Sequence, residues 1–203
     1  MKKYVEKAMT FAEYEKLIDD LLKEGKTTGL NQSVAMVGYG KLNRQRMNRL
    51  AKTVEISDRT KAAAKQVMRP MIWLILTEGW CGDAAQNVPV IEIIAAESDK
   101  IETRYILRDE NPDLMDRFLT NGARSIPKLI ALDTETLKVL GSWGARPAPA
   151  QKMFADMRAK GVCNDAIHEE IQRWYNSDKS ESIQREFEAL LDVWGEESVA
   201  VKE

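Results

Sequence analysis

The sequence predicts an α/β fold in which a mixed sheet is flanked by helices, with helical extensions at both ends of the chain. Residues 71–76 are uniformly apolar, which is typical of a strand that is buried on both faces. A helix-forming segment follows, and residues 101–107 then alternate between apolar and polar, so these two strands should be parallel and joined by a helical crossover. Two further strands, at 127–132 and 137–142, are separated by a tight turn and should form an antiparallel hairpin.

Three helices are expected before the first strand. Thr10 and Glu13 have the spacing of a capping box, and apolar residues recur at helical spacing until Gly25 ends the first helix. Residues 26–40 are rich in Gly, Thr, Ser and Asn, so we expect a loop or a short irregular segment there.

The second and third helices are expected over 42–54 and 59–67. Ser57 caps the third helix, and Pro70 ends it because proline disfavours the helical conformation of the preceding residue. The inward-facing residues of the second helix are expected to be Leu42, Met47, Leu50 and Val54.

The later helices and the chain ends complete the predicted organisation. The core should comprise residues 69–160, with an N-terminal helical extension over 1–68 packed on it and a C-terminal helical extension over 161–203. We expect the tail after Gly195 to be frayed. The helices after the first strand are expected over 86–96, where Pro89 should cause a kink, and over 112–119, 147–160, 165–175 and 180–194.

Several classes of function do not fit the composition. A formal net charge of −2 over 203 residues argues against a general affinity for nucleic acid. The longest apolar run, 71–76, is too short to cross a membrane, and the residues after Met1 lack the apolar segment of a secretory signal. Two cysteines and one histidine provide neither a disulfide framework nor a zinc site, so we expect a reduced, cytoplasmic protein without a metal.

The segment Trp80-Cys81-Gly82-Asp83 lies between the first strand and a helix and offers the clearest chemistry in the chain. The thiolate is the reactive form of cysteine, and the N–H groups and dipole of a helix N-terminus stabilise it. Gly82 lets the chain turn closely around the sulfur, and Trp80 should shield one side of it. A lone cysteine after a strand is more often buried and inert, but the surrounding motif favours a reactive one.

This motif resembles the Trp-Cys-Gly signature of the thioredoxin superfamily, and Ser125-Ile126-Pro127, Pro89 and the glycine segment 141–144 resemble other parts of it. The match covers about residues 65–160. The resemblance implies a thioredoxin-like core, a cis peptide bond before Pro127 that faces the cysteine, a backbone at Ile126 that binds an extended substrate, and a position for Gly144 beside the site.

A closer resemblance is to a bacterial thioredoxin-like subfamily that carries a Trp-Cys-Gly-Asp motif. Further shared segments are Arg108–Asn111, Leu119–Gly122 and Ile126–Lys128. The resemblance implies the fold but little about the substrate, because a fold does not determine a function.

Two groups that a dithiol enzyme uses are missing. Ala84 stands at the position of the second, resolving cysteine, and Ile75 stands where thioredoxins commonly bury an acid. A dithiol enzyme releases its mixed disulfide through attack by the second thiol, so Cys81 cannot complete that cycle alone. Cys163 should not replace it, because the preceding helix carries the chain about 20 Å away. We expect Cys163 to be a buried apolar residue.

Charged residues surround the motif. Asp83 and Glu78 should raise the pKa of the Cys81 thiol. The alternative roles for Asp83 are to stabilise the start of the helix, which we favour, or to shuttle a proton. We expect Arg124 and Arg146 to meet an anionic substrate group or a glutathione carboxylate.

A second group of cations lies in the N-terminal part of the chain, where no acid occurs between Glu24 and Glu55. These residues form either an anion site beside the cysteine or, as we favour, a solvated helix face. They include Lys41, Arg44, Arg46, Arg49 and Lys52.

Two hypotheses for function follow. The first is a monothiol thiol–disulfide oxidoreductase that acts on a protein or small-molecule disulfide, with glutathione or another low-molecular-weight thiol resolving the adduct and no bound cofactor. The second is a non-catalytic module that binds a peptide or partner. The candidate catalytic residues are Cys81 and Asp83, and the candidate substrate-binding residues are Trp80, Gly82, Ile126, Pro127, Arg124 and Gly144.

Overall fold

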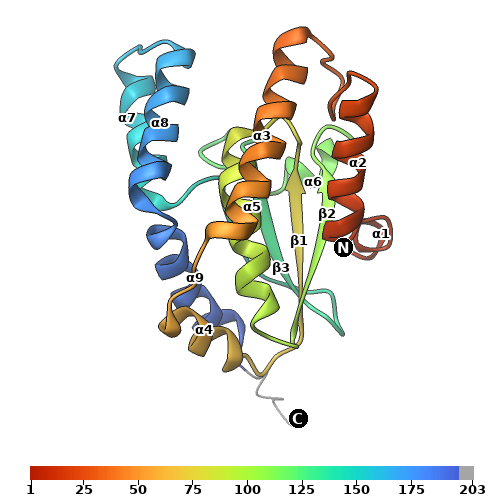
Figure 1. Ribbon diagram of the computed structural model, residues 1–203. Coiled ribbons are helices and arrows are strands. Elements are labelled where there is room, and N and C mark those ends of the chain that lie inside the picture. Colours follow the sequence, from red (N-terminus) through yellow and green to blue (C-terminus); the bar gives the residue numbers. More distant parts are fainter. Residues whose placement is uncertain (197–203) are drawn as a thin grey trace.

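A computed structural model describes residues 1–196, and Figure 1 shows a central sheet with helices packed around it. β1 pairs in parallel with β2 and antiparallel with β3, and β3 pairs antiparallel with β4, which confirms the predicted mixed sheet. We expected the tail after Gly195 to be frayed, and from residue 197 onward this tail lies outside the described part of the chain. The sheet order is β2-β1-β3-β4, with β1 at Met71–Thr77, β2 at Ile101–Leu107, β3 at Lys128–Asp133 and β4 at Val139–Trp143.

The helices largely follow the predicted order. Thr10 and Glu13 form the predicted capping box at the start of α2, and the Ser57 side chain caps α4. The helices are α1 (Lys2–Val5), α2 (Phe11–Lys23), α3 (Val34–Thr53), α4 (Asp58–Lys65), α5 (Gly82–Ala96), α6 (Pro112–Met115), α7 (Ala148–Ala159), α8 (Asn164–Asp178) and α9 (Glu181–Trp194).

β1 lies in the interior of the sheet, and all of its residues are buried, as its apolar sequence indicates. Side chains alternate along a strand, so Trp73 and Thr77 point to the same face. The Trp73 ring contacts Phe187 of α9, with ring centroids 5.2 Å apart. The Thr77 hydroxyl lies 3.1 Å from the hydroxyl of Tyr14 on α2. Helices from both ends of the chain therefore contact the same face of the sheet.

α3 differs most from the prediction. It begins at Val34, because the Ser33 side chain caps it, and so it occupies part of the segment expected to be a loop. Leu42, expected to face inward, is 43 % exposed, so the prediction was wrong for this residue. Gly40 lies inward instead, since a Cβ atom there would be 2.8 Å from the Thr27 hydroxyl. Met47 is buried as predicted.

The C-terminal helices pack in two separate groups. α7 and α8 stand side by side as a hairpin at one edge of the molecule (Figure 1) and share their own apolar cluster of Ala150, Ile167, Ile171 and Tyr175. α9 instead contributes Phe187 to the main core that contains the sheet. No helix within residues 1–196 combines the length and the apolar character that crossing a membrane requires.

Candidate active site

Cys81 is the N-cap residue of α5 and follows the short turn of residues 78–80 after β1. The helix begins at Gly82, four residues earlier than predicted. The backbone N–H of Ala84 donates a hydrogen bond to the Cys81 Sγ atom at 3.4 Å. The thiol donates to the Ile126 carbonyl at 3.3 Å, and the peptide bond between Ile126 and Pro127 is cis. The sulfur is thereby fixed between a helix N-terminus and the segment that precedes β3.

The turn that holds Cys81 is fastened by the N-terminal part of the chain. The Gly79 N–H donates to the Thr28 hydroxyl at 2.8 Å, and the Asn43 side-chain amide of α3 donates to the Gly79 carbonyl at 3.4 Å. The Cys81 N–H donates to the Glu78 carbonyl at 3.1 Å. Residues from the segment before β1 therefore bind both polar backbone groups of Gly79 in this turn.

The Cys81 thiol is protonated at neutral pH. Only 7 % of the residue is exposed, and this burial, together with the negative charge of Asp83, raises its pKa to about 12. The Ala84 N–H and the Arg146 cation act in the opposite direction but are outweighed. The helix N-terminus therefore does not by itself make this thiol a reactive thiolate.

Asp83 belongs to a buried polar network between α5 and the α7–α8 hairpin. Its Oδ2 atom forms an ion pair with Arg146 at 2.7 Å, and its Oδ1 atom accepts a hydrogen bond from the Tyr175 hydroxyl at 2.9 Å. The Arg146 guanidinium also lies over the Phe154 ring, 3.9 Å from its centroid. Burial raises the pKa of Asp83, whereas Arg146 and Tyr175 lower it. Both carboxylate oxygens of Asp83 are thus bound by side chains from the segment that contains α7 and α8, and these contacts join that segment to α5.

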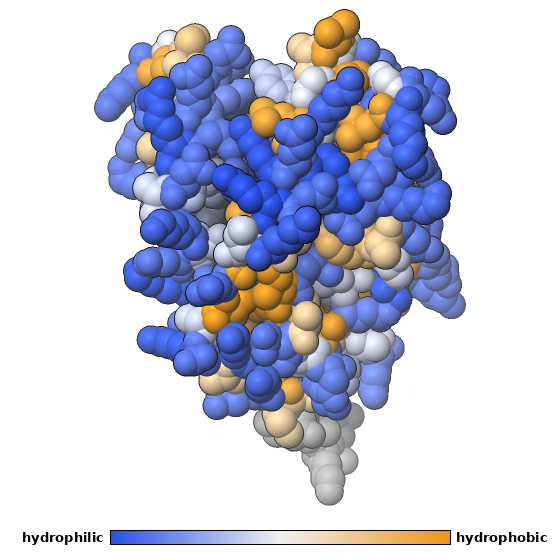
Figure 2. Space-filling model, in the orientation of Figure 1, coloured by the Kyte–Doolittle hydropathy of each residue, from blue (hydrophilic) through white to orange (hydrophobic). Residues whose placement is uncertain are grey.

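A cavity of about 990 Å³ opens beside Cys81 between α3 and α8. Figure 2 shows a notch in the molecular outline between the α7–α8 hairpin and α3. Apolar surface also appears at the outer end of α3 (Figure 2), where Val34 is almost fully exposed. Most of the predicted site residues line the cavity: Trp80, Cys81, Gly82, Asp83, Arg124 and Ile126.

The predicted site residues Gly144 and Pro127 do not line this cavity. Gly144 has a φ of +121°, and a Cβ atom there would be 2.1 Å from the Pro127 carbonyl oxygen. The Gly144 carbonyl accepts hydrogen bonds from Lys128 Nζ at 3.0 Å and from the Thr120 hydroxyl at 3.2 Å. Glycine is needed here because the two backbone segments approach so closely.

The arginines predicted to meet an anion are engaged by acids. Arg124 forms an ion pair with Asp116 at 2.6 Å, and Arg146 is held by Asp83. Arg44, on α3, pairs with Glu15 at 2.6 Å. Arg46, two residues further along α3 and therefore on a different side of that helix, instead lines the cavity.

Sequence reasoning missed the contribution of α8 to this site. Tyr175, His168 and Gln172 come from a helix more than 80 residues after Cys81, and no spacing in the sequence connects them to it. The sequence did contain a signal for Arg46, because no acid lies between Glu24 and Glu55. We favoured a solvated helix face over an anion site for this segment and therefore did not assign Arg46 to the site.

Cys163 was expected to be buried, and this was wrong. It is exposed and forms the N-cap of α8. The reason is local, because the residue lies in the turn between α7 and α8, where the chain reverses and side chains meet solvent.

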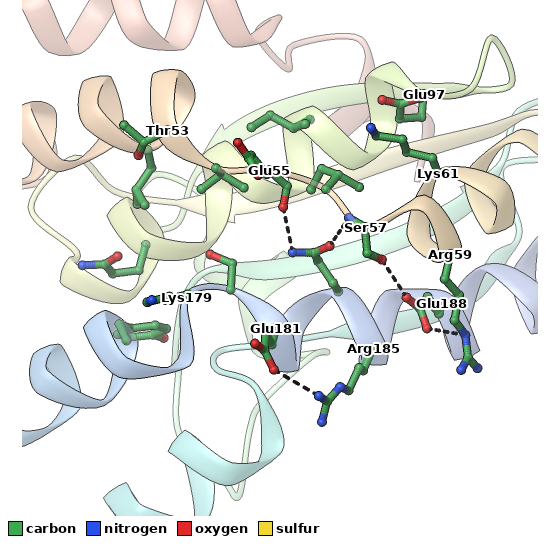
Figure 3. Close-up of a pocket in the computed structure, with 18 of the residues that line it drawn as sticks. Thr53, Glu55, Ser57, Arg59, Lys61, Glu97, Lys179, Glu181, Arg185 and Glu188 are labelled. Carbon is green, nitrogen blue, oxygen red and sulfur yellow. Dashed lines mark hydrogen bonds and ion pairs between the residues drawn. The ribbon is translucent and has the colours of Figure 1, made fainter.

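A second cavity, of about 1570 Å³, lies between the end of α3, α4, α8 and α9 (Figure 3). Two pairs of its charged side chains are matched: Glu188 pairs with Arg59 at 2.8 Å, and Glu181 with Arg185 at 3.0 Å. No cysteine or histidine lines it. Within residues 1–196, no group of three or more His, Cys, Asp or Glu side chains is arranged to hold a metal ion.

Comparisons with known proteins agree with this architecture. Two solved structures are similar, at TM-scores of 0.54 and 0.51: an HIV epitope-scaffold with 16 % identity and a protein of unknown function from Pseudomonas aeruginosa with 15 % identity. Each alignment covers 91 % of this chain and 98 % of the other, and identities this low bear on the fold alone. No curated protein matches the sequence. A family model described as thioredoxin matches residues 29–158, well over half of the chain, and the chain therefore belongs to the thioredoxin family.

Proposed function

We propose that the protein is a monothiol thiol–disulfide exchange protein in which Cys81 forms a mixed disulfide with an incoming disulfide. The observation that carries this proposal is the position of the Cys81 sulfur at the N-terminus of α5, 3.3 Å from the Ile126 carbonyl and beside an open cavity. Membership of the thioredoxin family supports the same chemistry.

The proposed reaction has two halves. The Cys81 thiol first loses its proton to solvent, and the thiolate attacks one sulfur of the substrate disulfide. A bond forms between Cys81 and that sulfur while the substrate S–S bond breaks, and the other sulfur leaves as a thiolate. Ala84 cannot attack this adduct, so the thiolate of an external low-molecular-weight thiol attacks the substrate sulfur that is bonded to Cys81. A new disulfide forms between the external thiol and the substrate sulfur while the bond to Cys81 breaks, and the Cys81 thiolate that leaves takes a proton from solvent.

The Ile126 carbonyl has two competing roles in this scheme. In the free protein it accepts a hydrogen bond from the Cys81 thiol. A substrate backbone N–H that takes this carbonyl would remove an interaction that favours the neutral thiol. Substrate binding would then assist loss of the proton at the moment when the thiolate is needed.

A second candidate function is a binding module in which Cys81 has no chemical role. The raised pKa of Cys81 favours it, because a thiol with a pKa of about 12 contains little thiolate at neutral pH. The occupied carboxylate of Asp83 favours it as well, since Arg146 and Tyr175 already bind both of its oxygen atoms.

Adduct formation separates the two candidates. The variant Cys163→Ser removes the exposed thiol, and incubation with glutathione disulfide followed by intact-mass measurement should give one adduct per chain. The matched control, Cys81→Ser with Cys163→Ser, should give none. If native Cys163→Ser protein gains no adduct while the urea-unfolded protein does, the thiol is inert in the fold and the binding module replaces the exchange reaction.

The finer family placement is also a proposal. The segments Trp80–Asp83, Arg108–Asn111 and Ile126–Lys128 support membership of the bacterial thioredoxin-like subfamily with the Trp-Cys-Gly-Asp motif. The ion pair between Arg108 and Asp109, at 2.7 Å, and the position of Arg108 over the Trp80 ring bring two of these segments together at the cavity.

A further inference from the structure

The Cys81 cavity contains one arginine whose charge no acid balances. The Arg46 Nη1 group donates a hydrogen bond to the side-chain Oδ1 atom of Asn43, which is uncharged, at 3.0 Å, and within residues 1–196 Arg46 forms no ion pair. The other arginines that line the cavity each contact an acid: Arg108 with Asp109, Arg124 with Asp116, Arg146 with Asp83, and Arg173 with Glu169 and Glu170. The unbalanced charge is therefore a particular property of Arg46.

This guanidinium lies close to the first turn of α5. A Cβ atom built on Gly82 would be 3.8 Å from Arg46 Nη1, so the cation lies above the residue that follows Cys81. Asn43 is buried and also donates to the Gly79 carbonyl at 3.4 Å. The same side chain thus orients the guanidinium and contacts the turn that holds the nucleophile.

The surroundings of Arg46 favour an anion. Burial lowers the pKa of its guanidinium, and the neighbouring Arg49 cation acts in the same direction. The positive end of the α5 dipole lies beside it. A half-buried cation next to a helix N-terminus, with no counter-ion of its own, is a site at which a carboxylate would be stabilised.

We infer that Arg46 binds a carboxylate of the molecule that exchanges with Cys81, so that the site selects low-molecular-weight thiols and disulfides that carry a carboxylate. This inference rests on the proposed exchange function. The cavity of about 990 Å³ has a size suited to a small ligand. Arg146 cannot serve in the same way, because Asp83 already holds its guanidinium.

A panel of disulfides that differ in charge tests the inference. In Cys163→Ser protein, the rate of adduct formation at Cys81 is measured by intact mass with dithiodipropionate, which is anionic, and bis(2-hydroxyethyl) disulfide, which is neutral. We expect the anionic reagent to react about tenfold faster than the neutral one, and Arg46→Gln to abolish this preference. The matched control is Arg49→Gln, which removes a cation from the same helix outside the cavity wall and should keep the preference.

Failure of the inference differs from failure of the exchange function. Equal rates for the two reagents, or a preference that survives Arg46→Gln, would overturn the role of Arg46 while leaving exchange at Cys81 intact. If neither reagent reacts, binding of S-methylglutathione to Cys81→Ser protein is measured by calorimetry. A weakening of at least about fivefold by Arg46→Gln then supports the carboxylate site without the chemistry, and equal binding overturns it.

Discussion

The replacement Asp83→Asn tests how the buried network controls the thiol. Asparagine keeps the shape of the side chain but removes the negative charge that helps to raise the pKa of Cys81 to about 12. It also frees the Arg146 cation, whose side chain is only 9 % exposed, from its ion pair. Both changes stabilise the thiolate, and a nearby charge shifts a pKa by about 1 to 3 units. The pKa of Cys81 should therefore fall by at least about one unit.

The same replacement should destabilise the fold. Arg146 would remain buried with the Phe154 ring and Gln151 as its neighbours but without a counter-ion. Removing one partner of a buried ion pair costs about 3 to 5 kcal/mol of unfolding free energy. Asp83 thus stabilises the contact between α5 and the α7–α8 hairpin and, by the same negative charge, makes the Cys81 thiol less reactive.

The assay is the rate of Cys81 alkylation against pH in the Cys163→Ser background, with urea unfolding measured in parallel. Circular dichroism must confirm that Asp83→Asn is folded at each pH, because an unfolded chain would also expose a thiol of ordinary pKa. Tyr175→Phe is the matched control, since it removes a hydrogen bond to Asp83 without changing a charge. An alkylation pKa in folded Asp83→Asn that equals or exceeds that of the parent would refute the argument.

Three further predictions concern stability. The pKa of Cys81 is higher in the folded protein than in the unfolded chain, so the protonated thiol stabilises the fold fully below about pH 9, and this stabilisation declines as the pH rises toward 12. In that pH window Cys81→Ala should make the decline of the unfolding free energy shallower by about 1.4 kcal/mol per pH unit, as measured by urea titration. An unchanged slope would contradict this expectation. Gly144→Ala should lower the unfolding free energy by about 3 kcal/mol or more, because the new Cβ atom would clash with a backbone carbonyl. Gly122→Ala has open space around it and should lower the unfolding free energy only by the backbone strain of about 1 to 2 kcal/mol. Similar urea midpoints for the two variants would contradict the role assigned to this close contact. Phe187→Ala should lower the unfolding free energy by about 3 to 5 kcal/mol, since this fully buried ring contacts two tryptophans. The control is Val193→Ala on the same helix, where the side chain is 68 % exposed and the change should be less than about 0.5 kcal/mol. A small effect at Phe187 would mean that α9 is not part of the core.

The elements that sequence reasoning placed well are those that local chemistry determines. β2 occupies the predicted residues, and β1 extends one residue beyond the predicted end. The position of Cys81 between a buried strand and a helix also followed from the order of apolar and helix-forming residues. These features need only the periodicity and the caps of a few neighbouring residues.

The elements that were missed depend on contacts between distant segments. α3 turns Gly40 and Asn43 inward as well as Met47, so its buried face is not an apolar stripe and the hydrophobic pattern identifies only part of it. The contact between Asp83 and Tyr175 requires the α7–α8 hairpin to return to α5 across 92 residues. Such polar contacts leave no periodic pattern in the sequence, since a single polar residue could equally well lie at the protein surface.

The lifetime of the Cys81 adduct tests the central claim most directly. Cys163→Ser protein that carries a glutathione adduct is freed of excess reagent and followed by intact mass, first alone and then after addition of a small external thiol. Because Ala84 stands where a resolving thiol would attack, the adduct should persist without external thiol and should be released, with recovery of free Cys81, once the thiol is added. Spontaneous loss of the adduct, or its resistance to added thiol, would contradict a single-cysteine exchange site.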